Sequence, residues 1–473
     1  MRVAPLAALC LTLGSANAAD PPTDRLVADE ARGFTGVEVA PPVEVAPVVI
    51  RGATVMTAAG DRHEPGYVVL VGGRIDAVGG GDAPEVAGAL VIDGDGMFVT
   101  PGLIDTHSHL GVYPSPHGRA HSDGNEATKP VTAGVWAEHA LWPQDPGIER
   151  AVAGGVTSMQ VLPGSANLIG GRGLVVHNVP HRGSRAMRFP GAPETLKMAC
   201  GENPKRVYGD KGGPSTRMGN LHGQRQAFFD AEEYQRKWLE YDRKLERQGG
   251  DVDKKKGVGR KDEPKPPARD LHMETLVGVL EGRILPQVHC YRADDMLSML
   301  QLSKEFGFQI RSFHHALEAY KIRDILASES VAVSTWADWW GFKLEAYDGI
   351  QENLAMVSEA GGIAVVHSDS GIGIQRLNQE AGKAYYRGLE AGLQLAEDDA
   401  LRWITHNPAW ALGIDHEVGT LESGKRGDVV VWDRHPFSVY ARARWVFIDG
   451  ALRYDAGSPQ TWSDFSIGQE VAP

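Results

Sequence analysis

Two histidines, His107 and His109, come directly after the apolar run TPGLID at residues 100–105, with one residue between them. The run is predicted to be a buried strand, and alternate side chains of a strand share one face. Both imidazoles would therefore point to the same place and could bind one metal ion. Because a solvated pair of histidines has the same spacing, the metal interpretation depends on what the other strands carry.

Further histidines and an aspartate end other predicted strands of the middle region. His289 ends ILPQVH, His314 ends FQIRSFH and is followed by His315, and Asp369 follows GIAVVHS. In a barrel of βα units, the active site is built at the C-terminal ends of the strands. These side chains would then meet on one rim, where imidazole and carboxylate are ligands that zinc prefers. The sequence predicts a divalent metal there, with zinc as the first candidate.

The elements that must position these residues alternate along the middle of the chain. There are eight predicted strands, most of them followed by a helical stretch, and this pattern favours a closed parallel barrel over an open sheet. The fold class is therefore α/β, with a (β/α)8 TIM barrel over residues 100–416. The predicted strands are GMFVTPGLIDTH, GVTSMQVLP, GLVVHN, TLKMAC, ILPQVH, FQIRSFH, SVAVST and GIAVVHSD.

Short β-branched runs punctuated by glycine occupy both ends of the globular region, at 48–99 and 417–455. They predict one small β-sandwich domain formed by both termini. One stretch inside the barrel, 217–271, fits neither pattern. Its first half has the helical spacing of Tyr234, Trp238 and Tyr241, and its second half is a mixed-charge loop rich in Gly and Pro. We expect an insertion that packs one helical face.

The N-terminus predicts export. Arg2, the apolar residues 3–13 and Ala16-Asn17-Ala18 form a signal peptide over 1–18, too short to span a bilayer as a mature helix. Leu9 precedes Cys10 where a lipoprotein signal has a small residue, so we expect a secreted or periplasmic protein without a membrane anchor. Residues 19–47 are rich in Pro, Ala and acid and are predicted to be a linker.

Composition and charge narrow the classes of partner. The 473 residues are 42% hydrophobic and 23% charged, as in a globular protein, and the formal net charge is −13. An acidic chain is a poor general binder of nucleic acid, so the expected partner is a small-molecule substrate. A homo-oligomer is compatible with the sequence. Cys200 and Cys290 remain after signal cleavage, and the sequence leaves open whether they pair.

The motif TPGLIDTHSH, together with PGSANLIGGRG, THNPAWALGI and GTLESGKRGDVVVWDRHP, resembles the amidohydrolase superfamily of metal-dependent hydrolases. The resemblance is to its imidazolonepropionase-like and metal-dependent dipeptidase branches, and it covers about residues 48–454. It implies a distorted (β/α)8 barrel, a split β-sandwich built from both termini, and one or two divalent metals.

Carried over by position, the resemblance implies these metal ligands: His107, His109, His289, His315 and Asp369. Asp369 would also be the general base. On the sixth strand the superfamily usually has His followed by Gly and, two residues on, Glu. HHALE fits this pattern if His315 is the ligand and Ala316 replaces the glycine, which leaves His314 as a neighbour of the site.

The fourth strand, ETLKMACGEN, matches the superfamily least well. It resembles the dipeptidase-like branch, in which a lysine that has been carboxylated by CO2 bridges two metals. Lys197 would be that lysine, since an unmodified ammonium would repel two cations. Glu202 could supply a carboxylate instead, and Lys197 could also form only a salt bridge.

Such a site predicts hydrolysis of an amide-type C–N bond, in a linear N-acyl or dipeptide substrate or in a cyclic amide, by metal-activated water. The superfamily also contains heterocyclic deaminases, which usually place a glutamate three residues after the fifth-strand histidine. Arg292 stands there in this chain and cannot act as that acid. A non-catalytic binding protein on the same barrel is the third interpretation, and such a protein would be expected to lose ligands. The tryptophans of TWADWWGF could contact substrate or belong to the core.

Overall fold

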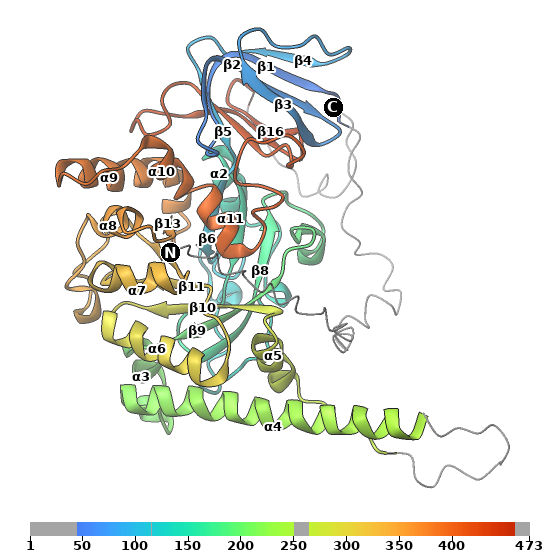
Figure 1. Cartoon of the computed structure of the whole chain (residues 1–473), viewed down its shortest axis with the longest axis vertical. Helices are drawn as coiled ribbons and strands as arrows, with labels where there is room; N and C mark the ends of the chain where they lie inside the picture. The colour runs from blue at the N-terminus through green and yellow to red at the C-terminus, as the bar shows by residue number, and fades with distance from the viewer. Residues whose placement is uncertain (1–44, 115, 250–263, 459–473) are drawn as a thin grey trace, which may run out of the picture. The chain divides into compact units, whose positions relative to one another are not determined.

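The computed structural model describes residues 45–114, 116–249 and 264–458 (Figure 1). The predicted signal peptide and most of the predicted linker lie outside these residues. The charged loop of the insertion is likewise outside them over residues 250–263. Among the described residues, none of the helices combines the length and apolar character needed to span a bilayer.

Strands from both ends of the chain form one sheet, in the order β16-β15-β14-β5-β1-β2-β3, with β4 paired to β1. Strand β5 joins the two ends, because it pairs in parallel with β1 and antiparallel with β14. The prediction that strands from both ends of the globular region form one small sheet domain is confirmed, whereas the description as a β-sandwich over 48–99 and 417–455 stays a prediction. The strands are β1 (Val48–Met56), β2 (Arg62–Val71), β3 (Arg74–Gly80), β4 (Leu90–Asp93), β5 (Phe98–Pro101), β14 (Val429–Trp432), β15 (Ala443–Ile448) and β16 (Ala451–Asp455).

A second sheet, in the order β13-β12-β11-β10-β9-β8-β7-β6, forms the distorted barrel. Most of its residues are buried, as expected for strands covered on both faces. Its two edge strands approach each other where the backbone N–H of Asp369 donates to the carbonyl of His107 at 2.9 Å. The strands are β6 (Leu103–Ser108), β7 (Val156–Val161), β8 (Ile169–His177), β9 (Glu194–Ala199), β10 (Ile284–Cys290), β11 (Ser312–His315), β12 (Ala332–Thr335) and β13 (Ala364–Val366).

The expectation that all eight barrel strands are parallel is wrong for β8. This strand pairs antiparallel with both β7 and β9. Only residues 162–168 connect β7 to β8. A parallel pair needs a crossover of roughly a dozen or more residues, so this connection can only reverse the chain.

The predicted first strand, GMFVTPGLIDTH, divides into two strands that belong to different sheets. Strand β5 lies in the sheet of the termini, and β6 begins the barrel. Gly102 stands at the junction, where a Cβ atom would lie 2.2 Å from Oγ1 of Thr157. The absence of a side chain therefore lets the chain pass from one sheet to the other.

The helices follow the barrel strands along the chain. Helix α6 has Asp294 and Asp295 in its first turn, Lys304 in its last turn and a left-handed Gly307 after it, as helix-end electrostatics and capping favour. The helices are α2 (Pro146–Ala153), α3 (Glu202–Tyr208), α4 (Arg217–Gly249), α5 (Leu271–Leu280), α6 (Ala293–Phe306), α7 (Arg323–Ser328), α8 (Asn353–Glu359), α9 (Leu377–Glu390), α10 (Glu397–Arg402) and α11 (His406–Leu412).

Helix α4 forms the described part of the insertion and packs along α5 and α6 (Figure 1). The hydroxyl of Tyr234 donates to Glu274 of α5 at 3.3 Å. The rings of Trp238 and Tyr241 lie against each other, with centroids 5.8 Å apart. One face of the predicted helix therefore packs.

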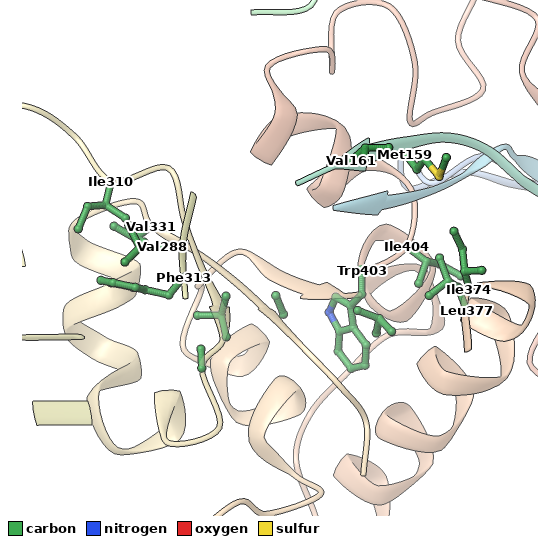
Figure 2. Packing of buried hydrophobic residues seen from close by; sticks show 14 of the residues in the cluster. Met159, Val161, Val288, Ile310, Phe313, Val331, Ile374, Leu377, Trp403 and Ile404 are labelled. Atoms are coloured by element: carbon green, nitrogen blue, oxygen red, sulfur yellow. The ribbon is translucent and has the colours of Figure 1, made fainter. Parts of the chain in front are cut away.

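The largest apolar core surrounds the barrel strands. Figure 2 shows a part of it, including Val288 of β10, Phe313 of β11 and the fully buried Trp403. Cys200, which follows β9, forms a disulfide with Cys290, the last residue of the neighbouring strand β10. This pair ties together the ends of two strands that carry candidate site residues.

Candidate metal centre

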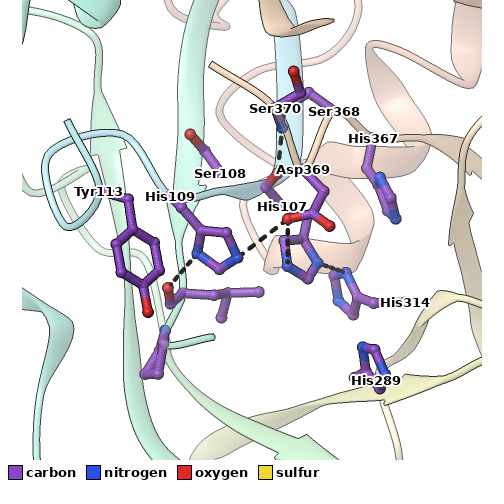
Figure 3. Close-up of polar contacts among 12 residues, drawn as sticks. His107, Ser108, His109, Tyr113, His289, His314, His367, Ser368, Asp369 and Ser370 are labelled. Atoms are coloured by element: carbon purple, nitrogen blue, oxygen red, sulfur yellow. Dashed lines mark hydrogen bonds and ion pairs between the residues drawn. The ribbon is translucent and has the colours of Figure 1, made fainter. Parts of the chain in front are cut away.

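His107 and His109 lie at the end of β6 and converge on Asp369, which follows β13 (Figure 3). The Oδ1 atom of Asp369 is 3.2 Å from Nε2 of His109 and 3.7 Å from Nε2 of His107. The Nδ1 atom of His109 donates to the carbonyl of Leu162 at 2.9 Å, so Nε2 is the ring nitrogen that faces the carboxylate.

A chain of hydrogen bonds sets the tautomer of His107. Gln287 donates from Nε2 to the carbonyl of Ala411, so its Oε1 accepts from Nε2 of His314 at 2.7 Å. The Nδ1 atom of neutral His314 then accepts from Nδ1 of His107 at 2.9 Å. The free lone pair of His107 is therefore on Nε2, the nitrogen that faces Asp369.

His289 and His315 complete the ring of imidazoles at the ends of β10 and β11. Their ring centroids are 4.6 Å apart, and both side chains are buried. The Nδ1 atom of His315 is 4.0 Å from Oδ2 of Asp369. Within the described part of the chain, the buried Nδ1 atoms of both histidines have no hydrogen-bond partner.

The donor set fits a divalent metal. Two ligands that bind one zinc ion at about 2.0–2.2 Å in tetrahedral geometry are roughly 3.4 Å apart. The three histidine-to-Asp369 distances, 3.2, 3.7 and 4.0 Å, bracket this separation. Burial lowers the pKa of His107, His289 and His315 well below the usual range, with Lys197 and neighbouring histidines contributing. These rings are therefore neutral and can act as ligands.

His314 and His315 have different environments, although they are neighbours in sequence. Both ring nitrogens of His314 already have partners, in His107 and Gln287. Only His315 offers a nitrogen without a partner to Asp369. The geometry therefore favours His315 as the ligand and gives His314 a supporting position.

Lys197 lies in the middle of β9, and its Nζ is 3.3 Å from Nε2 of His107. Burial lowers the pKa of this lysine from 10.5 to about 7, against the opposing charge of Asp369. Glu202 lies at the start of α3, where its Oε1 is 3.5 Å from Nζ of Lys343. The structure therefore brings Lys197 next to His107, whereas the carboxylate of Glu202 pairs with Lys343.

Asp369 has a left-handed backbone conformation, with φ of 46°, and His315 has φ of 71°. Such conformations are uncommon for residues other than glycine and concentrate at functional sites. Burial acts to raise the pKa of Asp369, but its hydrogen bond to His109 and the nearby positive charges bring the pKa below 3.8. The carboxylate is therefore ionised and able to accept a proton.

Asp105 lies beside the candidate site and was not predicted from the sequence. It is fully buried and accepts hydrogen bonds from the backbone of His107 and Ser368, at 3.0 and 3.1 Å, and from the hydroxyl of Ser368. Asp105 thus holds the backbone of two segments that carry candidate ligands. One is its own strand, which leads to His107, and the other is Ser368, the residue before Asp369. Gln287, two residues before His289, was also missed. The sequence holds the same signal for Asp105 and Gln287. Each is a polar residue in a predicted buried strand, two positions before a histidine and therefore on the same face of the strand.

The predicted aromatic cluster divides between core and cavity. Trp336 is buried and stacks on His315, with ring centroids 4.6 Å apart. Trp339 and Trp340 are exposed and line an open cavity that reaches Asp369. Arg292, which occupies the position of the deaminase glutamate, pairs with Asp294 at 2.9 Å.

Comparison with proteins of known sequence and structure identifies the family. The model of the "Amidohydrolase family" matches residues 300–456. A crystal structure of an amidohydrolase from Thermotoga maritima MSB8 is 35% identical, with a TM-score of 0.76 over 86% of this chain and 100% of that one. The chain belongs to the amidohydrolase family. It is therefore an enzyme of a family of hydrolases that act on carbon–nitrogen bonds.

Two curated relatives are similar to this chain over most of its length, and one is named an amidohydrolase and the other a deaminase. Amidohydrolase tasK of Hapsidospora irregularis is 35% identical over 410 residues, 83% of this chain but 39% of tasK. The chain thus spans about two fifths of the length of that relative. A 5-methylthioadenosine/S-adenosylhomocysteine deaminase of Symbiobacterium thermophilum is 25% identical over 82% of this chain and 85% of the deaminase.

Proposed function

We propose that this amidohydrolase cleaves an amide-type C–N bond, in a linear N-acyl or dipeptide substrate or a cyclic amide, with a divalent metal at the Asp369 site. The convergence of three histidine nitrogens on the two oxygens of one ionised carboxylate carries the proposal. The proposed ligands are His107, His109, Lys197 as its carboxylate, His289, His315 and Asp369. Zinc is the first candidate because imidazole and carboxylate predominate.

Different residues of the chain would have different roles in the proposed hydrolysis. The histidines and Asp369 would hold the divalent metal, which would supply a water of pKa about 7 and a charge to polarise the attacked carbonyl. Asp369 is positioned to accept the proton of the water on its carboxylate and to pass it to the leaving nitrogen. His314 and Gln287 hold His107 in the tautomer that presents Nε2, and Asp105 holds the backbone on both sides.

We also propose that the protein is exported. The support is the N-terminal sequence alone: Arg2, the apolar run at 3–13 and Ala16-Asn17-Ala18. N-terminal sequencing of the protein from the extracytoplasmic fraction should give a start near Ala19. A cytoplasmic protein that retains Met1 would contradict export and would leave the proposed reaction untouched.

A substrate panel tests the reaction class. The purified protein is assayed with N-acyl amino acids, dipeptides, a cyclic amide and an aminopurine nucleoside, before and after treatment with a chelator. We expect a free amine or a ring-opened acid from the amides, and loss of this activity on chelation. Release of ammonia from the nucleoside, with no cleavage of amides, would favour the deaminase alternative that the Symbiobacterium relative suggests.

A further inference from the structure

An open cavity of about 480 Å³ lies beside the candidate metal centre, and Asp369 forms part of its wall. Its other lining residues directly follow β10 or belong to the segment after β12: Tyr291, Trp336, Asp338, Trp339, Trp340 and Phe342. The volume is within the range of small-molecule sites, which are mostly apolar with a few polar groups. A ligand in this cavity would lie next to the carboxylate that is proposed to move the proton.

The aromatic rings of the wall are stacked outward from the metal centre. Trp336 lies between His315 and Trp339, with ring centroids 4.6 and 5.3 Å away and an interplanar angle of 19° in each pair. The indole N–H of Trp336 donates to the carbonyl of Ser368 at 2.9 Å, which fixes the ring next to Asp369. Trp336 therefore links the metal centre to the outer rings.

The outer rings remain exposed. Trp339 is 42% exposed, Trp340 54% and Phe342 55%. Neighbouring large apolar side chains that are exposed together often mark a binding site. These three apolar side chains are therefore exposed to solvent in the cavity beside the candidate metal centre.

The segment that carries these rings is held in place by polar contacts. The ammonium of Lys343 donates to Asn203 at 2.9 Å and lies 4.0 Å from the ring centroid of Tyr291. The carboxylate of Glu345 accepts from the backbone N–H of Glu202 at 2.9 Å. Because both contacts reach α3, the aromatic wall is preorganised, which lowers the entropic cost of binding.

The charges of the wall indicate an uncharged ligand group. Among the described residues that line the cavity, there is no lysine or arginine. Asp338 is paired with Lys383 at 2.9 Å, and Asp369 faces the histidines. An anionic group would therefore find no cationic side chain in this lining, whereas a planar apolar group could stack on the exposed indoles.

We infer that this cavity is a subsite for an uncharged aromatic group of the substrate, attached close to the scissile amide bond. The inference rests on the proposed function, because it places the group relative to Asp369. It names the substrate class as amides of aromatic amino acids or of similar aromatic amines and acids. Aromatic rings bring a large apolar area, so they should gain most from this wall.

Relative specificity tests the inference. kcat/KM is measured for N-acetyl and N-glycyl derivatives of phenylalanine, glycine and lysine. We expect the phenylalanine derivatives to exceed the glycine derivatives by about tenfold or more, as expected from burial of a phenyl side chain. Equal values for phenylalanine and glycine would overturn the subsite. Preference for lysine would overturn it too, since it would indicate a cage for a cation.

Two variants and a matched control assign the preference to the cavity. Trp339→Ala and Trp340→Ala should each lower the phenylalanine-to-glycine ratio several-fold, because each removes an exposed ring from the wall. Phe229→Ala is the control, since Phe229 is a similarly exposed aromatic residue, 52%, on helix α4. A ratio unchanged in both tryptophan variants, or lowered equally in the control, would contradict the assignment.

Binding without turnover separates this inference from the proposed function. N-acetylphenylalanine and N-acetylglycine are titrated into the Asp369→Asn protein while tryptophan fluorescence is recorded. We expect a saturable change with N-acetylphenylalanine at concentrations at least about tenfold lower than with N-acetylglycine. If the wild type cleaves no amide but this difference is present, the proposed reaction fails and the subsite stands. If amides are cleaved and the difference is absent, the subsite fails alone.

Discussion

The ammonium nitrogen of Lys197 lies 3.3 Å from Nε2 of His107, and both side chains are fully buried. A charged ammonium here would repel any metal that His107 binds. Burial lowers the pKa of Lys197 to about 7, so that much of the lysine is the neutral amine near neutral pH. The neutral amine is the form that reacts with CO2, and the product would turn a repelling group into a ligand.

The two candidates for a bridging carboxylate can be separated by mutation. Lys197→Ala should lose at least one metal and most activity, because a methyl group cannot replace the carboxylate. Glu202→Gln should change metal content little, since Glu202 faces Lys343. The metal content and activity of both variants are measured side by side. The opposite pattern, with metal lost in Glu202→Gln and retained in Lys197→Ala, would assign the carboxylate to Glu202.

Asp369→Asn should abolish turnover while much of the metal remains bound. Asparagine keeps an oxygen that can act as a ligand, but it cannot accept a proton from water. Steady-state kinetics and metal analysis of the same preparation check the two parts of this prediction. A near-normal kcat with full metal content would show that another residue is the base.

Gln287→Leu should weaken metal binding about 10- to 100-fold, as is typical when a group that orients a metal ligand is removed. Without Oε1 of Gln287, nothing favours the His314 tautomer that accepts from His107. The matched control is Gln160→Leu, which removes another buried barrel glutamine that hydrogen-bonds Thr195. Competition with a metal indicator measures both affinities. Equal losses in the two variants would refute an orienting role for Gln287.

Asp105 should give the metal-free protein a distinct pH dependence. Burial raises its pKa from 3.8 to about 6, so the folded state holds this proton more tightly than the unfolded state. The stability from that proton is fully present below pH 3.8 and is lost as the pH rises through about 6. The wild type should therefore lose roughly 3 kcal/mol of unfolding free energy relative to Asp105→Asn over this interval.

Denaturant unfolding of both proteins at several pH values checks the prediction for Asp105. The variant is expected to be less stable at every pH, because an amide cannot accept all the hydrogen bonds of the carboxylate. Only the difference in slope tests the pKa. Parallel curves for the two proteins would show that Asp105 titrates alike in the folded and unfolded states.

The sequence predicts the strand ends well because their chemistry is local. His107, His109, His289, His315 and Asp369 each follow a β-branched or apolar run, and barrel geometry then places these runs on one rim. The direction of β8 could not be predicted from its own residues, since a buried strand has the same composition in either direction. Only the short connection at 162–168 carried that information.

Contacts between residues far apart in the chain could not be predicted from the sequence. The hydrogen bonds of Asp105 with Ser368 join residues 263 positions apart, and no local pattern pairs them. The choice between Lys197 and Glu202 likewise depends on Lys343, a residue far along the chain that takes Glu202 as its partner. Such pairings are properties of the packed barrel.

The metal content of the purified wild type, measured together with amide hydrolysis before and after chelation, tests the central claim most directly. We expect at least one divalent ion per chain, close to two with Lys197 carboxylated, and activity that falls on chelation and returns with metal. His107→Ala should lose metal and activity together. A wild type that contains no metal and cleaves amides at an unchanged rate in the presence of chelator would contradict the account.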